Sequence, residues 1–161
     1  DTNDALGGDG PISPERAGNV PGFPLVEKCF SGNWTESQIK KRLVGRGGAV
    51  AYFGTNDFRE IAARAEAGEE ACAVFLKGFC VSVAKYVGAL ATVVGGKVDA
   101  IVLTGGIAHS KMIVDDIIER VGFIAPVVVY AGENELESLA ENGYGIMAGE
   151  FDIKYYHPDH F

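Results

Sequence analysis

The chain has 161 residues, of which 47% are apolar, and a formal net charge of −8 at pH 7. This length and apolar content suffice for one compact domain with a sizeable core. The acidic balance and the absence of a Lys/Arg cluster argue against nucleic acid as a partner, because proteins that bind a phosphate backbone neutralise it with clustered positive charge. No uninterrupted apolar run reaches the roughly 20 residues of a membrane-spanning helix, and the first residues lack a basic-then-apolar secretion signal, so we expect a soluble protein without a membrane partner.

The first part of the chain predicts loops and short helices. Residues 1–24 are rich in Gly, Pro, Asn and Asp and predict a long structured loop. Residues 24–30 and 35–44 have helical spacing, the second with Thr35 as N-cap and Gly45 as terminator. Both segments predict short helices.

A stretch bracketed by glycines connects these helices to the rest. Residues 45–57 are apolar between their glycines, and the Gly-Gly at 47 and 48 predicts a flexible connection. Either Asn56 or Asp57 can cap a helix that runs to about Gly68. The spacing does not choose between the two caps.

The second part of the chain predicts a parallel α/β unit. Residues 69–94 are apolar on most faces and predict a long, largely buried helix. After it, strands and helices alternate: strand 98–104, helix 110–122, strand 125–132 and helix 134–150, followed by an irregular tail at 150–161.

Cysteine usage favours a reducing compartment. The three cysteines, Cys29, Cys72 and Cys80, are odd in number and lack the spacing of a disulfide framework. If Cys72 and Cys80 share a helix, they lie about 12 Å apart along its axis, too far for a disulfide. We therefore expect reduced thiols in a cytoplasmic protein. The chain begins without Met in a Gly-punctuated segment, and we expect it to be a fragment of a longer chain.

A glycine pair, Gly105 and Gly106, separates the first predicted strand from the helix after it. In open α/β sheets, ligands bind beyond the carboxyl ends of the strands, where glycine lets the backbone approach a phosphate or sugar. The following residues lack the Gly-Lys-Ser/Thr of a P-loop and the third Gly of a dinucleotide fingerprint. By itself the pair fits a binding loop and an ordinary tight turn equally well.

Two polar stretches permit a binding role and a structural one. Arg16 stands among Pro and Gly, where a guanidinium held by stiff turns could clamp a carboxylate or phosphoryl group, although most loop arginines are simply solvated. Asp57 could accept from a ribose hydroxyl, Phe58 could stack on a base, and Arg59 could approach phosphate. The alternative is an N-capped surface helix with Phe58 in the core.

Two further patterns carry less weight. Residues 82–85, SVAK, match the Ser-x-x-Lys of penicillin-binding enzymes, but the accompanying Ser-Asp-Asn and Lys-Thr-Gly are absent, so we take the match as chance. His157 and His160 in the sequence HPDH could be metal ligands. Two histidines without a third ligand in a tail are more often solvated or part of a contact, so we do not expect a metal there.

Four motifs taken in order resemble the carboxyl half of butyrate kinases: DALGGDGPISPERAG, GTNDFREI, VDAIVLTGGIAHSK and FIAPVVVYAGENELESLAENG. Butyrate kinases belong to the acetate kinase group of the sugar kinase, Hsp70 and actin superfamily. The resemblance extends through about Glu150. It implies an α/β, ribonuclease-H-like fold (the actin-like ATPase fold), with residues 1–161 as the nucleotide-binding carboxyl domain of a two-domain kinase. Residues 1–24 would be an active-site loop segment and residues 150–161 a tail.

The resemblance also implies a reaction. A phosphoryl group would move between ATP and butyrate, or a related short- or branched-chain fatty acid, to give an acyl phosphate and ADP. ATP and Mg²⁺ are the implied cofactors. Arg16 would correspond to the family's catalytic arginine, because a positioned guanidinium stabilises the charge that spreads over the phosphoryl oxygens in the transition state.

The implied nucleotide site draws on separate motifs. It would be lined by Asp57, Phe58 and Arg59, and by an adenosine loop of Gly105, Gly106, Ile107 and Ala108. Glu135 falls where the family places an acid near Mg²⁺, and Glu133 is close enough to leave that assignment open. Acetate kinases continue the loop with Gly-Glu-Asn where this chain has Ala108, His109 and Ser110, which favours the butyrate branch and leaves His109 without an inherited role.

Half of the implied active site is not in this chain. The family's phosphate loop, Asn-x-Gly-Ser-Thr-Ser, is absent, so we expect the isolated chain to be inactive or nearly so. The alternative is a non-catalytic nucleotide-binding or dimerisation module with the same fold. Family dimers pack through this domain, which implies a homodimer. The preferred acid stays open, because each methylene gives only about 1 to 3 kcal/mol of discrimination in an apolar pocket.

Overall fold

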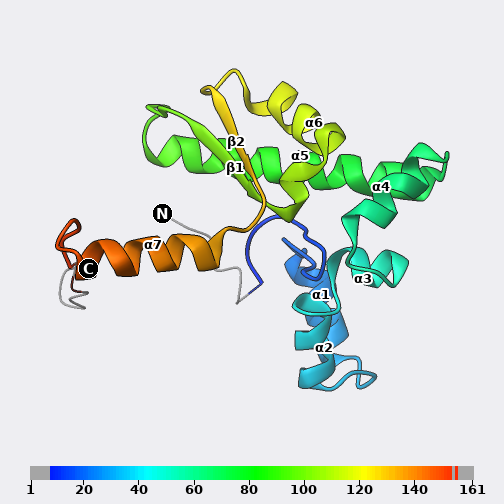
Figure 1. Ribbon diagram of the computed structural model, residues 1–161. Coiled ribbons are helices and arrows are strands. Elements are labelled where there is room, and N and C mark those ends of the chain that lie inside the picture. Colours follow the sequence, from blue (N-terminus) through cyan, green and yellow to red (C-terminus); the bar gives the residue numbers. More distant parts are fainter. Residues whose placement is uncertain (1–7, 154, 156–161) are drawn as a thin grey trace.

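The computed structural model describes residues 8–153 and residue 155 (Figure 1). The part before the first strand is helical, with α1 (Gly22–Phe30), α2 (Glu36–Leu43), α3 (Gly48–Phe53), α4 (Phe58–Glu66) and α5 (Glu70–Val93). The remainder consists of strand β1 (Ile101–Gly105), the 3-10 turn η1 (Gly106–His109), α6 (Lys111–Val121), strand β2 (Val127–Ala131) and α7 (Glu135–Met147).

The two strands form a parallel pair connected by α6. Ile101 lies opposite Val127, and the register continues to Gly105 opposite Ala131. Helix α6 packs against α5, which in turn packs against α4. Parallel strands joined by a helix confirm the predicted α/β class.

The core lies where α4, α5, α6 and β1 meet. Ile113, Ile117 and Val121 recur at every fourth position of α6 and are at most 4% exposed, so one face of this helix is buried. From α4, Phe58 packs edge-on against Phe79 of α5, with ring centroids 5.0 Å apart. Aromatic pairs at this distance and angle add stability beyond the area they bury.

Helix α5 is less buried than its composition predicts. Its buried residues all lie between Cys72 and Cys80, whereas Val93 near its end is 59% exposed. Only five of its 24 residues are buried, so the prediction of a largely buried helix is wrong. By length and composition alone this helix could cross a membrane, although Lys77 and Lys85 interrupt its apolar sequence. Helices α4 and α6 pack against it.

The predicted caps of the short helices are confirmed. The Thr35 hydroxyl accepts a hydrogen bond from the Gln38 backbone N–H, and the Gln38 side chain accepts one from the Thr35 N–H, which forms a capping box. Of the two candidates before α4, Asp57 is the cap. The residues that form each cap lie within three positions of each other in the sequence, which is why the sequence alone predicts them.

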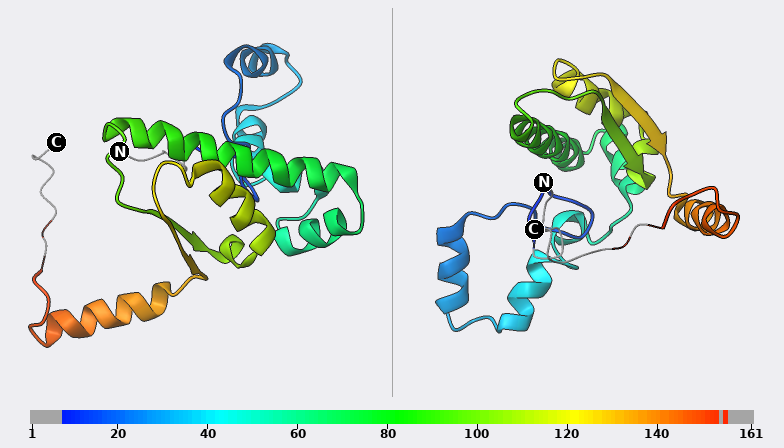
Figure 2. Two further views of the ribbon diagram at one scale, coloured as in Figure 1. Left: turned by 90° about the horizontal axis from the view of Figure 1, so that it is seen from above. Right: turned by 90° about the vertical axis from the view of Figure 1, so that its left-hand side faces the viewer.

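Two parts of the chain project from the core. Figures 1 and 2 show α7 extending away on one side and the α1–α2 hairpin on another. Helix α1 has no buried residue, and α7 exposes most of its large apolar side chains. All three cysteines are free thiols, as predicted, with Cys29 exposed and the other two buried.

Candidate functional site

The loop that carries Arg16 is folded back on itself. The Ser13 N–H donates to the Arg16 carbonyl at 3.1 Å, and the Arg16 N–H donates to the Ser13 hydroxyl at 3.0 Å. Arg16 also forms a single antiparallel bridge with Val44, beyond the end of α2. The backbone of this arginine is therefore fixed from both sides.

A second segment holds the same loop by its carbonyl groups. The Glu15 carbonyl accepts from the N–H groups of Gly45 and Gly47 at 2.9 and 3.0 Å. The Ser13 carbonyl accepts from the Ala49 N–H at 3.2 Å. Because residues 45–49 supply these donors, the segment around the glycine pair is an ordered support for the Arg16 loop, and the prediction of a flexible connection is wrong.

The glycine pair at this contact is required by space. A Cβ on Gly48 would lie 1.9 Å from the Ser13 carbonyl oxygen, and one on Gly47 would lie 2.5 Å from the Ala17 nitrogen. Gly48 also has a φ of +53°, in the left-handed region that favours glycine. The two glycines thus allow a close approach of two backbones.

The residues before Arg16 are attached to α5. The Ile12 N–H donates to the Ser82 hydroxyl at 3.2 Å, and the Gly10 N–H donates to the Tyr86 hydroxyl at 3.2 Å. Ser82 therefore has a structural partner, in keeping with a chance match of SVAK to penicillin-binding enzymes. Sequence reasoning did not find these supporting residues, because their partners lie more than 60 residues away.

Asp57 and Arg59 form a charged pair at the start of α4. The Asp57 carboxylate accepts from the Arg59 backbone N–H at 2.9 Å and from its guanidinium at 2.9 and 2.7 Å. These hydrogen bonds lower the pKa of Asp57 to about 2. The Arg59 side chain is 92% exposed, so the pair can be reached from solvent.

Between these two residues, Phe58 points inward. Its side chain is 6% exposed and its ring lies 6.0 Å from that of Phe75. This is the core position that the sequence left open as the alternative. The ring is not placed at the surface, where a base could stack on it.

The loops of Arg16 and Asp57 are joined by a hydrogen bond. The Asn56 side-chain amide donates to the Glu15 carboxylate at 2.8 Å. Each of these residues is the chain neighbour of a predicted site residue. Two motifs that are separate in the sequence are therefore side by side in the fold.

The predicted adenosine loop follows β1 as expected, but it contains a 3-10 turn. Gly105 ends the strand with a φ of +86° and exchanges two backbone hydrogen bonds with Gly132, at 3.2 and 3.1 Å. Gly106, Ile107 and Ala108 then lie in η1, with Gly106 exposed and the other two half-buried. His109 Nε2 lies 3.4 Å from the position that a Cβ on Gly132 would take, so the imidazole packs beside the end of β2.

Glu133 and Glu135 follow the end of β2. Both are exposed, and Glu135 is the first residue of α7. Among residues 8–153 and 155, no three His, Cys, Asp or Glu side chains are grouped to hold a metal. A single carboxylate nevertheless fits Mg²⁺, which proteins commonly bind with one or two carboxylates and the phosphates of a substrate. His157 and His160 lie outside the described residues.

These parts lie toward a common region. The carboxyl ends of β1 and β2 meet at one edge because the strands are parallel. In Figure 1 the loop of residues 8–20 and these strand ends both lie below α5. The arrangement agrees with ligand binding beyond the carboxyl ends of parallel strands.

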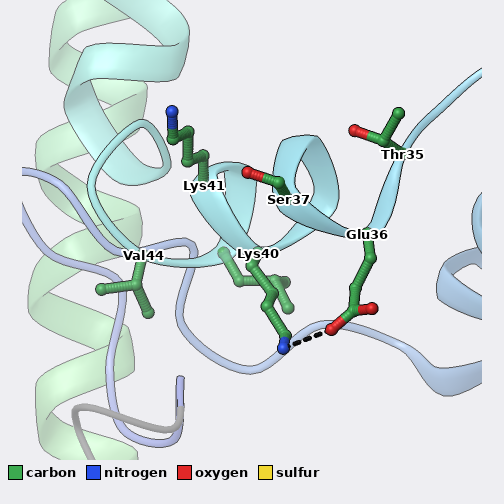
Figure 3. Close-up of a pocket in the computed structure, with 7 residues that line it drawn as sticks. Thr35, Glu36, Ser37, Lys40, Lys41 and Val44 are labelled. Atoms are coloured by element: carbon green, nitrogen blue, oxygen red, sulfur yellow. Dashed lines mark ion pairs between the residues drawn. The ribbon is translucent and has the colours of Figure 1, made fainter.

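A hollow of about 770 Å³ along α2 has none of the predicted site residues in its lining, although its lining residue Val44 is bridged to Arg16. Its lining consists of Thr35, Glu36, Ser37, Lys40, Lys41, Leu43 and Val44. Lys40 forms an ion pair with Glu36 there (Figure 3). The exposed pair raises the pKa of Lys40 and lowers that of Glu36, and this side of α2 contains none of the residues expected to bind the nucleotide.

Comparison with known proteins gives consistent matches over most of the chain. The sequence model of the Acetokinase family matches residues 16–143. A protein named probable butyrate kinase from Clostridium botulinum (strain Alaska E43 / Type E3) is 47% identical over 156 residues, which cover 97% of this chain and 44% of that protein. A protein of the same name from Phocaeicola vulgatus is 48% identical over 159 residues, or 99% of this chain and 45% of that protein. The chain thus spans less than half the length of these relatives.

A solved structure shares the fold. The acetate kinase of Porphyromonas gingivalis matches with a TM-score of 0.74 and 19% sequence identity, over 86% of this chain and 41% of that one. At this identity the likeness speaks for the fold alone. It confirms the predicted fold class independently of the sequence motifs.

Proposed function

Because the chain belongs to the acetokinase family, we propose that it is part of a kinase that transfers a phosphoryl group from ATP to a short-chain carboxylate. The proposed acid is butyrate or a related short- or branched-chain fatty acid, and the products are an acyl phosphate and ADP. The name of the relatives, probable butyrate kinase, supports this choice of acid. Within the structure, the proposal rests chiefly on the Glu15–Asn56 hydrogen bond of 2.8 Å, which joins the loops of Arg16 and Asp57.

Arg16 is the catalytic arginine in this proposal. Charge spreads over the phosphoryl oxygens during transfer, and a guanidinium held in place stabilises it. The loop supports such a role because its backbone is hydrogen-bonded on both sides. No residue in the described part of the chain forms an ion pair with Arg16, so its charge is available to an incoming anion.

The nucleotide is proposed to bind at the strand ends. Gly105, Gly106, Ile107 and Ala108 would contact adenosine, with the backbone close to the sugar. Asp57 and Arg59 would line the same pocket from the start of α4, while Phe58 anchors that segment in the core.

Glu135 is the residue we propose to lie near Mg²⁺, with Glu133 as the alternative. Both follow β2 and are exposed to a ligand beyond the strand ends. The ion, when bound with ATP, neutralises charge on the phosphates. Either carboxylate would hold it together with phosphate oxygens and water.

The same proposal extends to the organisation of the whole protein. Residues 1–161 would form the carboxyl-terminal, ribonuclease-H-like domain of a cytoplasmic, homodimeric two-domain kinase, and would supply one half of the active site. Residues 1–24 would be an active-site segment and residues 150–161 a tail. The isolated chain would then be inactive or nearly so, because the amino-terminal domain of the kinase would hold the phosphate loop.

The reaction is tested with the intact protein that contains this chain. ATP and butyrate should give acyl phosphate, measured by trapping it with hydroxylamine. Arg16→Ala should lower kcat by about 10²- to 10³-fold, as removal of a transition-state donor does. Arg46→Ala is the matched control, because Arg46 is an exposed arginine of the neighbouring segment. An intact protein that phosphorylates no short-chain acid would overturn the assignment, and an Arg16→Ala variant with unchanged kcat would remove the arginine from the mechanism.

A second candidate is a non-catalytic module for nucleotide binding or dimerisation. The exposed apolar side chains of α7 favour it, since Leu136 is 84% and Met147 is 79% exposed. ATP that binds only the folded chain should raise its melting temperature. Thermal stabilisation by ATP without turnover in the intact protein would support this candidate over the kinase, whereas turnover would exclude it.

A further inference from the structure

The α1–α2 hairpin contains a second hollow, of about 410 Å³, which the proposed kinase site does not use. Its lining is mostly apolar and consists of Ala17, Val20, Pro24, Leu25, Lys28, Trp34, Ile39, Arg42 and Leu43. Within residues 8–153 and 155, no acidic residue lines it. We refer to it as the hairpin pocket.

Two cations flank the one indole of the chain in this pocket. Lys28 Nζ lies 5.8 Å and Arg42 Cζ 5.7 Å from the centre of the Trp34 ring. Such contacts favour the position of a cation but do not neutralise its charge. The two helices therefore hold two positive charges beside one apolar cavity.

Neither cation has an acidic partner among the residues that the structure describes. The neighbouring hollow on the other side of α2 differs in this respect, because Lys40 there is paired with Glu36 (Figure 3). In a chain with a net charge of −8, carboxylates are plentiful. Two cations left without one at the mouth of an apolar cavity fit an anion that comes from outside.

We propose that the hairpin pocket binds an amphipathic carboxylate, a medium-chain fatty acid anion such as octanoate or decanoate. The head group would pair with Lys28 and Arg42, whose donors suit a carboxylate. The tail would lie against the apolar lining, including Leu25 and Ile39. The volume is at the small end of ligand pockets, which span about 300–1,000 Å³, and this suits a single flexible chain.

The pocket shares a wall with the Arg16 loop. Ala17 and Leu43 both line it, and the Ala17 N–H donates to the Leu43 carbonyl at 2.9 Å. An anion that moves α2 therefore moves the backbone next to Arg16. Binding at the pocket would therefore change kcat. This effect on kcat rests on the proposed kinase function, whereas binding of the anion does not depend on it.

Trp34 reports binding directly, because it is the only tryptophan of the 161 residues. Titration of this chain with decanoate, below its micelle concentration and without ATP, should change the Trp34 fluorescence saturably. Lys28→Gln and Arg42→Gln should each weaken binding by about tenfold, the effect of losing one charge-assisted hydrogen bond. Lys41→Gln is the matched control, since Lys41 is an exposed lysine of α2 that lines the other hollow. Circular dichroism checks that each variant keeps its helices.

Three results would overturn the proposal. Decanol has the same tail without the charge, so equal affinity for decanol would mean that no anion is recognised. Equal affinity for inorganic phosphate would mean that the apolar lining contributes nothing. Folded Lys28→Gln and Arg42→Gln variants with unchanged decanoate affinity would remove the two cations from the site. None of these measurements uses ATP. They therefore test binding at the hairpin pocket even if the protein proves not to be a kinase.

Discussion

Replacement of Gly48 by alanine tests how the Arg16 loop is held in place. A Cβ at this position would lie 1.9 Å from the Ser13 carbonyl oxygen and 2.8 Å from the Arg16 carbonyl oxygen. Contacts this short with backbone atoms cannot be relieved by a side-chain rotation, so the loop must move. Its movement would break the hydrogen bonds that the N–H groups of Ala49 and Val50 donate to the carbonyls of Ser13 and Pro14.

The expected loss of stability combines two effects. A left-handed φ, here +53°, costs an alanine about 1–2 kcal/mol. Two broken backbone hydrogen bonds add about 1 kcal/mol each. Gly48→Ala should therefore lower the free energy of unfolding by about 3–4 kcal/mol.

Gly54→Ala is the matched control at the other end of α3. Gly54 also has a left-handed φ, of +75°, but no atom lies within 4 Å of the position of its Cβ. It should lose only the conformational part, about 1–2 kcal/mol. Urea unfolding measures both variants, and their m values should stay equal to that of the unmodified chain.

The comparison can contradict the structural argument. Equal losses for Gly48→Ala and Gly54→Ala would mean that the loop does not contact α3 as closely as the glycines imply. In the intact protein, the same movement should lower kcat for Gly48→Ala and leave it unchanged for Gly54→Ala. An unchanged kcat in a destabilised Gly48→Ala protein would separate the loop position from catalysis.

Three other changes have expected outcomes. Gly106→Val in the intact protein should weaken ATP binding, measured by calorimetry, more than it changes the KM for the acid. Unchanged nucleotide affinity would mean that Gly105 and Gly106 form only a turn between strand and helix. Asp57 has its pKa lowered from 3.8 to about 2 by Arg59, so its stabilising effect is present above about pH 4 and lost as the pH falls through 2. Asp57→Asn should therefore lower the melting temperature above pH 4 and have a smaller effect at pH 2, whereas an equal effect at both would exclude the charge as the cause. Ile113 is 1% exposed, so Ile113→Ala should lower the free energy of unfolding by about 2–5 kcal/mol and Ile113→Val by about 1 kcal/mol. Urea unfolding measures both variants, and similar losses for the two would mean that Ile113 does not lie in a packed core.

Elements with local signals could be predicted from the sequence. The capping box of Thr35 and Gln38 involves residues three positions apart, and the cap at Asp57 bonds to a residue two positions away. The β1–α6–β2 unit has a change of hydrophobic period at each boundary. In each case the residues that decide the structure are neighbours in the chain.

Features that depend on distant contacts could not be predicted. The glycines at 47 and 48 read as flexible because glycine is permissive by itself, yet here they allow the Arg16 loop to approach closely. The burial of α5 depends on which of its residues the other elements pack against, which its own sequence pattern does not contain. Phe58 was open between core and surface for the same reason, since only the positions of Phe75 and Phe79 decide it.

Gly105, the last residue of β1, and Gly106, the first of η1, differ in what their backbones require. Gly105 has a φ of +86°, so the turn itself requires glycine there. Gly106 is exposed, lies outside the left-handed region, and has no atom within 4 Å of the position of a Cβ. Because neither conformation nor packing requires glycine at 106, substitution at this position should leave the fold intact and so tests the proposed role of Gly106 in nucleotide binding separately from folding.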